Sequence, residues 1–208
     1  MIERISHAIG RDVPRETFER LKNYVALLIE ANAEHNLIAR STIDDIWERH
    51  IVDSAQLLRL SDSPGNWLDV GSGAGLPGLV IAILNPAPVT LVEPRRLRVE
   101  FLQSVVERLA LANVSIVQGK TGAVTGVFSH VTARAVAPAT SLFAFTHVLS
   151  RPETVWLLPK GRTAQKELDE ARQAWQGAFE LLPSLTDPDA SILVARGVRP
   201  RQRVRGRR

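Results

Sequence analysis

The sequence contains no cysteine, one methionine and one tyrosine among its 208 residues. Without cysteine, the chain has no disulfide framework, no thiolate metal site and no thiol nucleophile. No apolar run reaches the roughly 18 residues expected of a membrane span. The opening residues, "MIERISHAIG", lack the apolar core of a signal peptide. We therefore expect one soluble, cytoplasmic globular domain with a small appendage, large enough to bury its own core.

Positive charge is concentrated at the C-terminal end. Residues 196–208, "RGVRPRQRVRGRR", carry seven arginines and no acid. Taking these seven positive charges from the net charge of +4 leaves −3 for the rest of the chain. The sequence therefore predicts a basic, flexible tail over residues 198–208 that binds a polyanion. The alternative is a solvated arm without a partner.

Two segments before residue 64 have apolar residues at helical spacing, which predicts amphipathic helices over residues 14–32 and 41–60. After the break "SDSPGN", short apolar runs alternate with helical patterns. Strands are expected over 67–70, 89–93, 114–118, 130–136, 154–160, 179–185 and 191–198. Helices are expected over 78–85, 95–111, 139–149 and 164–176.

This alternation predicts an α/β fold, a mostly parallel seven-stranded sheet with helices on both faces. The last two strands are expected to form a closing antiparallel pair. The predicted organisation is an N-terminal helical appendage over residues 1–63, a core over 64–197 and the basic tail over 198–208.

The stretch "DVGSGAGLPG", residues 69–78, follows the first strand of the core. In open α/β sheets, ligands bind beyond the carboxyl ends of the strands, where such loops lie. Gly73, Gly75 and Gly78 satisfy the dinucleotide spacing G-x-G-x-x-G, with Glu93 twenty residues after Gly73. An NAD-dependent oxidoreductase is therefore one interpretation.

Asp69 argues against that interpretation, because a fixed carboxylate would oppose a pyrophosphate. S-adenosylmethionine carries a sulfonium and an ammonium group instead, and a nearby carboxylate favours both. The run D-x-G-x-G-x-G, formed by Asp69, Gly71, Gly73 and Gly75, thus predicts a site for this methyl donor. Asp69 could otherwise simply cap the turn or the following helix.

Glu93 ends the second predicted strand, where its carboxylate can accept hydrogen bonds from both ribose hydroxyls of the donor. The alternative is a solvated acid at a strand end.

Several longer motifs resemble the RsmG (GidB) family, the 16S ribosomal RNA guanine-N7 methyltransferases. They are "HNLIARST" from His35, "RHIVDS" from Arg49, "LDVGSGAGLPGL" from Leu68, "RAVA" from Arg134 and "PKG" ending at Gly161. The likeness runs from about residue 14 to residue 197. It implies a class I S-adenosylmethionine-dependent methyltransferase of Rossmann-like fold. The implied target is a guanine of 16S rRNA, at nucleotide 527 in the decoding-centre loop.

The resemblance also implies site residues. Gly71 and Leu76 would contact the donor, Thr121 and Gly122 would flank its adenine, and Arg134, ending the fourth strand, would line the donor site and face the target. The family often has an acid where this chain has Gly122, which offers only its backbone for a contact there.

Guanine N7 offers a lone pair and has no proton to lose, so its methylation needs alignment rather than a general base. The sequence lacks the Asn/Asp-Pro-Pro-aromatic motif expected for methylation of an exocyclic amine, and it has no cysteine for cytosine C5 chemistry. Arg134 could donate to guanine O6 while leaving N7 free, or it could simply pair with a surface acid.

Lys160 ends the fifth predicted strand on the same edge, where it could contact an RNA phosphate or remain solvated. The tail arginines Arg199, Arg201, Arg203 and Arg205 are further candidates for RNA binding. The roles of His50 and Asp53 stay open, between ordering the cofactor loop and satisfying local polar groups.

The five histidines are not clustered, so no metal is expected. The expected partner is 16S rRNA or the 30S subunit, bound by a monomer. A small-molecule methyltransferase remains a second interpretation, since it would share the donor site without needing the tail.

Overall fold

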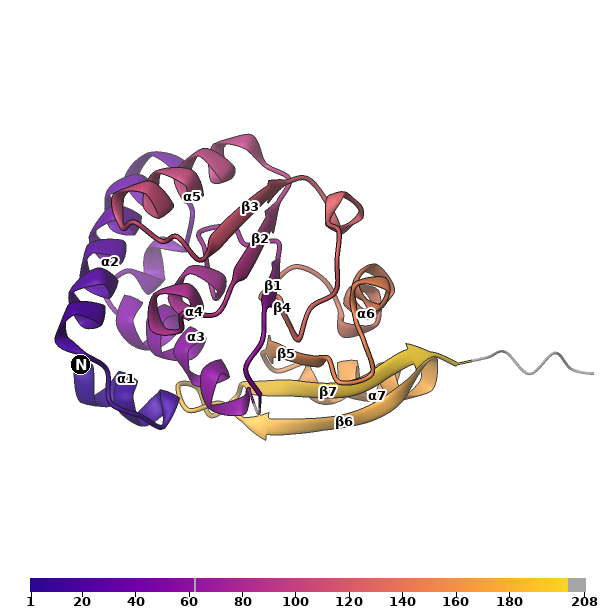
Figure 1. Ribbon diagram of the computed structural model, residues 1–208. Helices are drawn as coiled ribbons and strands as arrows, with labels where there is room; N and C mark the ends of the chain where they lie inside the picture. The colour runs from indigo at the N-terminus through magenta and orange to yellow at the C-terminus, as the bar shows by residue number, and fades with distance from the viewer. Residues whose placement is uncertain (62, 202–208) are drawn as a thin grey trace, which may run out of the picture.

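The computed structural model describes residues 1–61 and 63–201 as an α/β fold around one seven-stranded sheet (Figure 1). The strands are β1 (Trp67–Val70), β2 (Val89–Glu93), β3 (Val114–Gln118), β4 (His130–Thr132), β5 (Val155–Lys160), β6 (Trp175–Pro183) and β7 (Ser191–Pro200). Their order is β3-β2-β1-β4-β5-β7-β6. The first five strands are parallel, and β7 runs antiparallel to both β5 and β6. The predicted sheet and its closing antiparallel pair are confirmed.

Helices cover both faces of the sheet. They are α1 (Ile2–Ile9), α2 (Arg15–His35), α3 (Asp53–Ala55), α4 (Gly78–Leu84), α5 (Arg96–Arg108), α6 (Ala139–Thr146) and α7 (Ala164–Ala174). Successive strand residues point to opposite faces. Trp67 accordingly belongs to the core cluster that includes residues of α1 to α5, whereas Leu68 belongs to the cluster that includes residues of α6 and α7.

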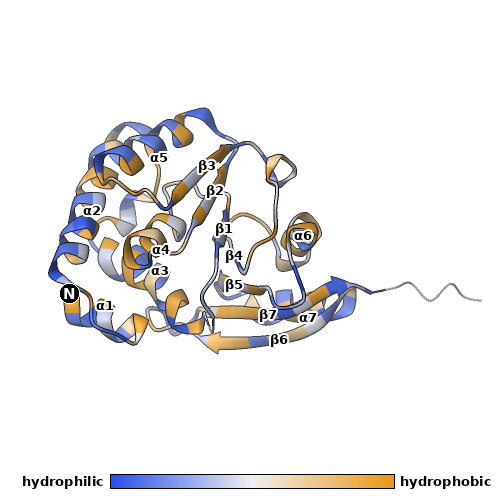
Figure 2. Ribbon diagram, in the orientation of Figure 1, coloured by the Kyte–Doolittle hydropathy of each residue, from blue (hydrophilic) through white to orange (hydrophobic). Residues whose placement is uncertain are grey.

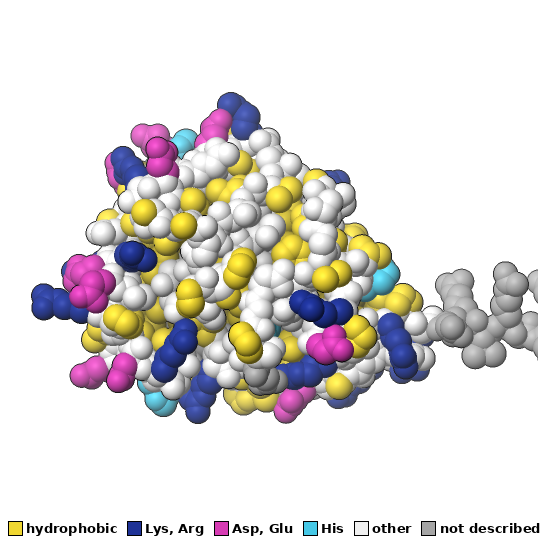
Figure 3. Space-filling model, viewed as in Figure 1, with side chains coloured by type: hydrophobic (Ala, Val, Ile, Leu, Met, Phe, Trp, Pro, Cys, Tyr) yellow, Lys and Arg dark blue, Asp and Glu magenta, His cyan; other side chains and the backbone are white. Residues whose placement is uncertain are grey.

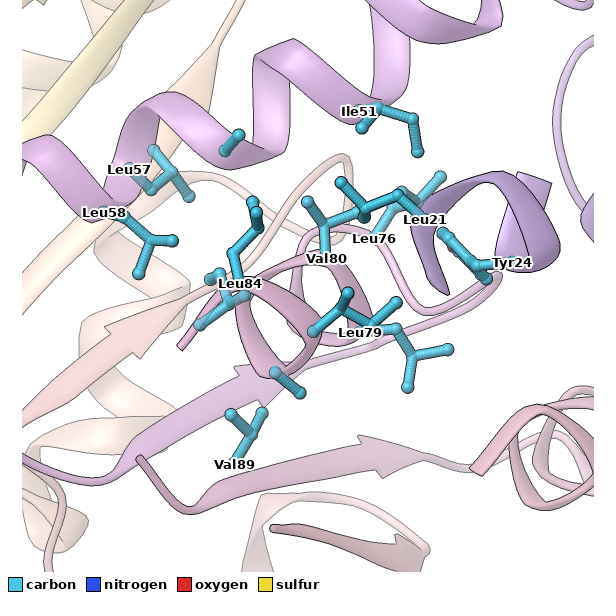
Figure 4. Packing of buried hydrophobic residues seen from close by; sticks show 14 of the residues in the cluster. Leu21, Tyr24, Ile51, Leu57, Leu58, Leu76, Leu79, Val80, Leu84 and Val89 are labelled. Atoms are coloured by element: carbon cyan, nitrogen blue, oxygen red, sulfur yellow. The ribbon is translucent and has the colours of Figure 1, made fainter. Parts of the chain in front are cut away.

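Helix α4 lies between the sheet and the N-terminal helices. All seven of its residues are buried, and Figure 2 shows it mostly apolar, whereas α2 and α5 carry polar stripes. Leu79 and Val80 lie between Leu21 and Ile51 of the N-terminal segment and Val89 of the sheet (Figure 4). The N-terminal segment therefore shares one core with the sheet.

Several parts of the secondary structure differ from the prediction, among them strand β6, which begins at Trp175 inside the helix expected over 164–176. The single helix expected over 41–60 is instead a 3₁₀ turn at Arg40–Thr42, a π-helix at Trp47–Val52, helix α3 and a 3₁₀ helix at Gln56–Leu60. Strand β4 ends at Thr132 rather than at residue 136, because the chain turns away at Ala135, whose φ is +55°. Helix α1 was not predicted, although Ile2, Ile5 and Ile9 have helical spacing.

Strand β7 continues to Pro200, past the predicted boundary between core and tail at residue 197. Gln176 pairs with Arg199 and Trp175 with Pro200, so the start of the predicted tail is part of the sheet. On the face shown in Figure 3, side chains of both charge signs are interspersed, mainly around the periphery. Within the described residues, no helix is long and apolar enough to span a membrane.

Close packing at Gly78 gives a test of this arrangement. A Cβ atom added there would meet a methyl group of Leu91 and would lie 2.6 Å from Asp69 Oδ2. Gly78→Ala should therefore lower the free energy of unfolding by about 1–3 kcal/mol, the usual range for overpacking. Gly161→Ala is the control, because a Cβ there meets nothing within 4 Å. Urea denaturation of both variants measures the effect, and equal stability of the two would contradict the described contact between α4 and the sheet.

Candidate active site

A cleft of about 1010 Å³ opens at the carboxyl ends of the parallel strands. Loops after β1, β2, β4 and β5 line it, as ligand sites of open α/β sheets require. Two other segments complete the wall: the N-terminal segment around His50 and the turn between β6 and β7. The predicted site residues that line the cleft are Gly71, Gly73, Leu76, Glu93, Arg134 and Lys160.

The glycine loop between β1 and α4 needs its glycines for backbone conformation. Gly71 and Gly73 have φ values of +68° and +57°, in the left-handed region. A Cβ on Gly71 would lie 2.5 Å from a methyl carbon of Val136, whereas a Cβ on Gly73 would have no atom nearer than 3.7 Å. Because Gly73 also lines the cleft, its open side is free for close approach of a ligand.

Three side chains outside the loop hold it in place. Gly73 N donates to Glu93 Oε2 at 2.8 Å, and the Tyr24 hydroxyl donates to the Ala74 carbonyl at 2.7 Å. Gly78 N donates to Asp69 Oδ2 at 3.1 Å. Tyr24 was not predicted as a site residue, and its place in the buried stripe of α2 gave no sign of a hydroxyl partner.

Asp69 is completely buried and does not line the cleft. Its carboxylate caps the first turn of α4 through Gly78, and Oδ1 has no hydrogen-bond partner within the described residues. Burial raises the pKa of Asp69 from 3.8 to about 7, against the hydrogen bonds that favour the ionised form. The alternative role that we considered, a cap on the following helix, is therefore present in the structure.

Glu93 is 2% exposed and ends β2 at the cleft. Its Oε1 accepts a hydrogen bond from Arg95 N at 2.9 Å, and Arg98 Nη1 lies 3.9 Å from Oε2. Each carboxylate oxygen can accept more than one hydrogen bond. Glu93 can therefore hold the glycine loop and still accept from a ligand in the cleft.

Arg134 lies in the loop after β4, not at the end of the strand as predicted, since β4 ends at Thr132. Its Nη1 donates to the Arg49 carbonyl at 3.2 Å and to Asp53 Oδ2 at 3.3 Å. Its Nη2 lies 3.1 Å from His50 Nδ1. His50 and Asp53, whose roles the sequence left open, both contact Arg134.

The contacts of His50 define its protonation state. Arginine only donates hydrogen bonds, so His50 Nδ1 is the acceptor. Thr42 Oγ1 lies 2.8 Å from His50 Nε2 and gives its own proton to the Ala39 carbonyl, so Nε2 carries the imidazole proton. Burial, together with the charges of Arg134 and Arg49, lowers the pKa of His50 from 6.5 to about 4.

Lys160 is not the surface cation that the sequence suggested. Its side chain is 8% exposed, and Nζ lies 2.8 Å from Glu167 Oε2 and 3.1 Å from the Ala137 carbonyl. Burial alone would raise the pKa of Glu167, but the hydrogen bonds from Lys160 and Ala139 N outweigh it and keep the pKa low. The pair therefore fixes α6 and α7 beside the cleft, and Lys160 is ion-paired rather than solvated.

The remaining predicted site residues lie elsewhere. Gly75 packs against Leu79 of α4, and Thr121 and Gly122 form a 3₁₀ turn after β3, outside the cleft lining. Arg199 Nε donates to Gln176 Oε1 across the β6–β7 pair, and Arg201 Nε donates to backbone carbonyls of Arg172 and Trp175. Arg203 and Arg205 lie outside the described residues. No group of three or more potential metal-ligating side chains occurs in the described part of the chain.

The turn between β6 and β7 was missed as part of the site. Thr186 Oγ1 donates to Asp53 Oδ1 at 3.0 Å, and Arg49 Nη1 donates to Asp187 Oδ2 at 2.9 Å. Leu185 N donates to Gln56 Oε1 at 2.8 Å. Figure 1 shows this turn reaching the N-terminal helices. No local pattern in "LTDPDA" could reveal contacts with residues more than 120 positions earlier in the sequence.

Comparison with solved structures shows the same fold. A methyltransferase from Geobacter sulfurreducens matches with a TM-score of 0.57 and 14% identity, covering 84% of this chain and 88% of that one. Fibrillarin from Aeropyrum pernix, solved with S-adenosyl-L-methionine bound, matches with a TM-score of 0.52 and 13% identity, covering 65% and 67%. With the observed strand order, these likenesses show the class I S-adenosylmethionine-dependent methyltransferase fold.

Comparison of sequences identifies the family. The family model GidB, described as rRNA small subunit methyltransferase G, matches residues 17–188. A protein named ribosomal RNA small subunit methyltransferase G from Zymomonas mobilis is 45% identical over 205 residues, covering 94% of this chain and 93% of the relative. One from Sphingopyxis alaskensis is 46% identical, covering 90% and 82%. The chain belongs to the rRNA small subunit methyltransferase G family, which argues against the oxidoreductase interpretation.

The buried carboxyl group of Asp69 predicts a pH effect on stability. Its folded-state pKa of about 7 lies above the ordinary 3.8. Between these two pH values the unfolded chain releases a proton that the folded protein keeps, so the free energy of unfolding falls as the pH rises. Asp69→Asn keeps an acceptor for Gly78 N and removes the titration. The free energy of unfolding of the variant, relative to the wild type, should rise by on the order of 1 kcal/mol per pH unit between about pH 5 and 6.5. Urea denaturation across this range measures it, and a constant difference would contradict the raised pKa.

Proposed function

We propose that this protein transfers a methyl group from S-adenosyl-L-methionine to N7 of a guanine in 16S rRNA. By family resemblance the target is nucleotide 527 in the decoding-centre loop. Membership of the rRNA small subunit methyltransferase G family supports the class of reaction and of substrate. The state of the acidic and imidazole groups around the cleft supports the choice of N7.

All acids and histidines among the cleft-lining residues already have partners within the protein. His50, Asp53, Glu93, Glu167 and Asp187 are each hydrogen-bonded to side chains or backbone. His50 accepts through Nδ1 and donates through Nε2, which leaves no lone pair for a substrate proton. Methylation at guanine N7 has no proton to remove, so this cleft fits a reaction controlled by alignment.

The residues around the glycine loop fit the methyl donor. The open side of Gly73 permits close approach, and the carboxylate of Glu93 at the end of β2 can accept from the ribose hydroxyls. Asp69 Oδ1 is a buried acceptor without a partner among the described residues, and the charge of an ionised Asp69 behind the loop would favour positive charge on the donor. S-adenosylmethionine would supply an electrophilic methyl group on its sulfonium.

Arg134 is the side chain best placed to hold the guanine. Three hydrogen bonds on Nη1 and Nη2 anchor its guanidinium. The Nε–H and one Nη2–H make no hydrogen bond within the described structure and remain for a substrate acceptor. Donation to guanine O6 would orient the base and leave N7 free. The tail arginines, including Arg203 and Arg205, would add phosphate contacts without sequence choice.

The decisive experiment uses labelled donor and three RNA substrates. Tritium should pass from S-adenosylmethionine to naked 16S rRNA or to 30S particles but not to tRNA, and nucleoside analysis should recover 7-methylguanosine. The single-turnover rate at saturating donor and saturating RNA should be nearly flat from about pH 6 to 9, because no base has to ionise. A tenfold rise per pH unit, or label in another nucleoside, would reject N7. Transfer to none of the three RNA substrates would favour the small-molecule methyltransferase.

The donor site can be tested at Gly73. Asparagine tolerates positive φ, so Gly73→Asn should fold while its side chain occupies the open side of the loop. The donor Kd should rise at least about tenfold, as for loss of one good contact. Gly197→Asn is a matched control, because Gly197 has φ +60° with nothing within 4 Å of a Cβ and does not line the cleft. Calorimetry with S-adenosylhomocysteine measures both, and similar affinities would remove the glycine loop from the donor site.

A further inference from the structure

The orientation of Arg134 depends on residues far from it in the sequence. It lies in a loop next to Ala135, which holds an unusual φ of +55°, so no strand or helix of its own fixes the side chain. Long arginine side chains lose considerable rotamer entropy when ordered. The ordering contacts come from Arg49, His50 and Asp53, more than 80 positions earlier.

A π-helix at Trp47–Val52, continued directly by α3 from Asp53, brings these three acceptors together. Helices of this kind are rare, and they occur often at functional sites because the wider turn redirects backbone and side chains. Here the Arg49 carbonyl, His50 Nδ1 and Asp53 Oδ2 lie within 3.1–3.3 Å of one guanidinium. Asp53 is itself held through Oδ1 by Gln56 Nε2 and Thr186 Oγ1.

We propose that His50 is a positioning residue for the methyl-transfer reaction: as a neutral imidazole protonated on Nε2, it orients the Arg134 guanidinium toward the target base. The inference rests on the proposed function of Arg134 in the cleft. Thr42 fixes the tautomer, since its hydroxyl proton goes to the Ala39 carbonyl and its oxygen accepts from Nε2. Asp53 balances the charge of Arg134, whereas the neutral His50 fixes the orientation of the guanidinium through a hydrogen bond.

The neutral state of His50 follows from its surroundings. An imidazolium would direct an N–H at the guanidinium and add a third positive charge beside Arg49 and Arg134. The nearby carboxylates are occupied elsewhere, Asp53 by Arg134 and Asp187 by Arg49. The lowered pKa of His50 agrees with this arrangement.

Two amide substitutions separate the two sides of the imidazole. In His50→Asn, the side-chain oxygen takes the place of Nδ1 and can still accept from Arg134. In His50→Gln, the amide reaches the place of Nε2, keeps a contact with Thr42 and loses the acceptor for Arg134. We expect His50→Asn to retain single-turnover transfer to 16S rRNA within about fivefold, and His50→Gln to lose about 10- to 100-fold, the effect of one hydrogen bond to a charged group. Donor affinity should match the wild type in both.

A double-mutant cycle distinguishes positioning from a general structural role. Arg134→Met should itself lower the transfer rate, and His50→Gln should then cause no further loss, because His50 acts through Arg134. Additive losses, or equal losses in the Asn and Gln variants, would overturn the proposal.

A spectroscopic readout keeps this test separate from the proposed function. Nitrogen-15 NMR of the ligand-free protein near pH 7 should show His50 protonated on Nε2, with an Nδ1 signal that shifts in Arg134→Met. A proton on Nδ1 would overturn the pairing whatever the enzyme methylates. If the wild type labels no RNA while the signals are as expected, the proposed function fails and the pairing of His50 with Arg134 stands.

Discussion

Two buried carboxylates at the ends of neighbouring parallel strands hold the glycine loop, and the cleft depends on that loop. Asp69 binds Gly78 N at the first turn of α4, and Glu93 binds Gly73 N in the middle of the loop. A loop with several residues at positive φ has large conformational entropy in the unfolded chain. Fixing it at two backbone N–H groups turns a flexible segment into a defined wall of the cleft. The cost is the burial of Asp69, which raises its pKa.

The N-terminal segment completes both the core and the cleft. Helix α4 is apolar on all sides, so it can be buried only if another layer covers the side facing away from the sheet. The N-terminal helices provide that layer through Leu21 and Ile51. The same segment carries Thr42, His50 and Asp53 into the cleft. The N-terminal segment therefore covers α4 and orients Arg134 through the same packing arrangement.

The strands and most helices could be predicted because their patterns are local. The short apolar runs of the buried strands, the break at "SDSPGN" and the glycines before α4 are each features of a few neighbouring residues. The glycine loop and Glu93 were accordingly located at the cleft from sequence. The π-helix could not be predicted, because the apolar spacing over residues 41–60 fits an ordinary α-helix. The acceptors that it presents to Arg134 become visible only in the folded protein.

Charged side chains were harder to predict than backbone elements, because their partners are distant in sequence. Lys160 was expected to be free, yet Glu167 pairs with it across the turn from β5 to α7. Arg134 was expected at a strand end, yet its position depends on Asp53 and His50. The sequence pattern shows which charged residues lie near the edge of the sheet. It does not show which acid forms an ion pair with which base.

Charge pairing also bears on the reaction that we propose. Methylation of N7 places a positive charge on the guanine, so unpaired cations close to it would oppose product formation. Arg134, Lys160 and Arg49 line the cleft, and each is paired with a carboxylate, Asp53, Glu167 and Asp187 respectively. Arg134 can therefore donate hydrogen bonds to O6 with its charge largely compensated. Directed N–H donation and charge compensation are compatible at these three cations because their carboxylate partners come from separate elements. The N-terminal segment, α7 and the β6–β7 turn supply them, and the fold brings these elements to one edge of the sheet.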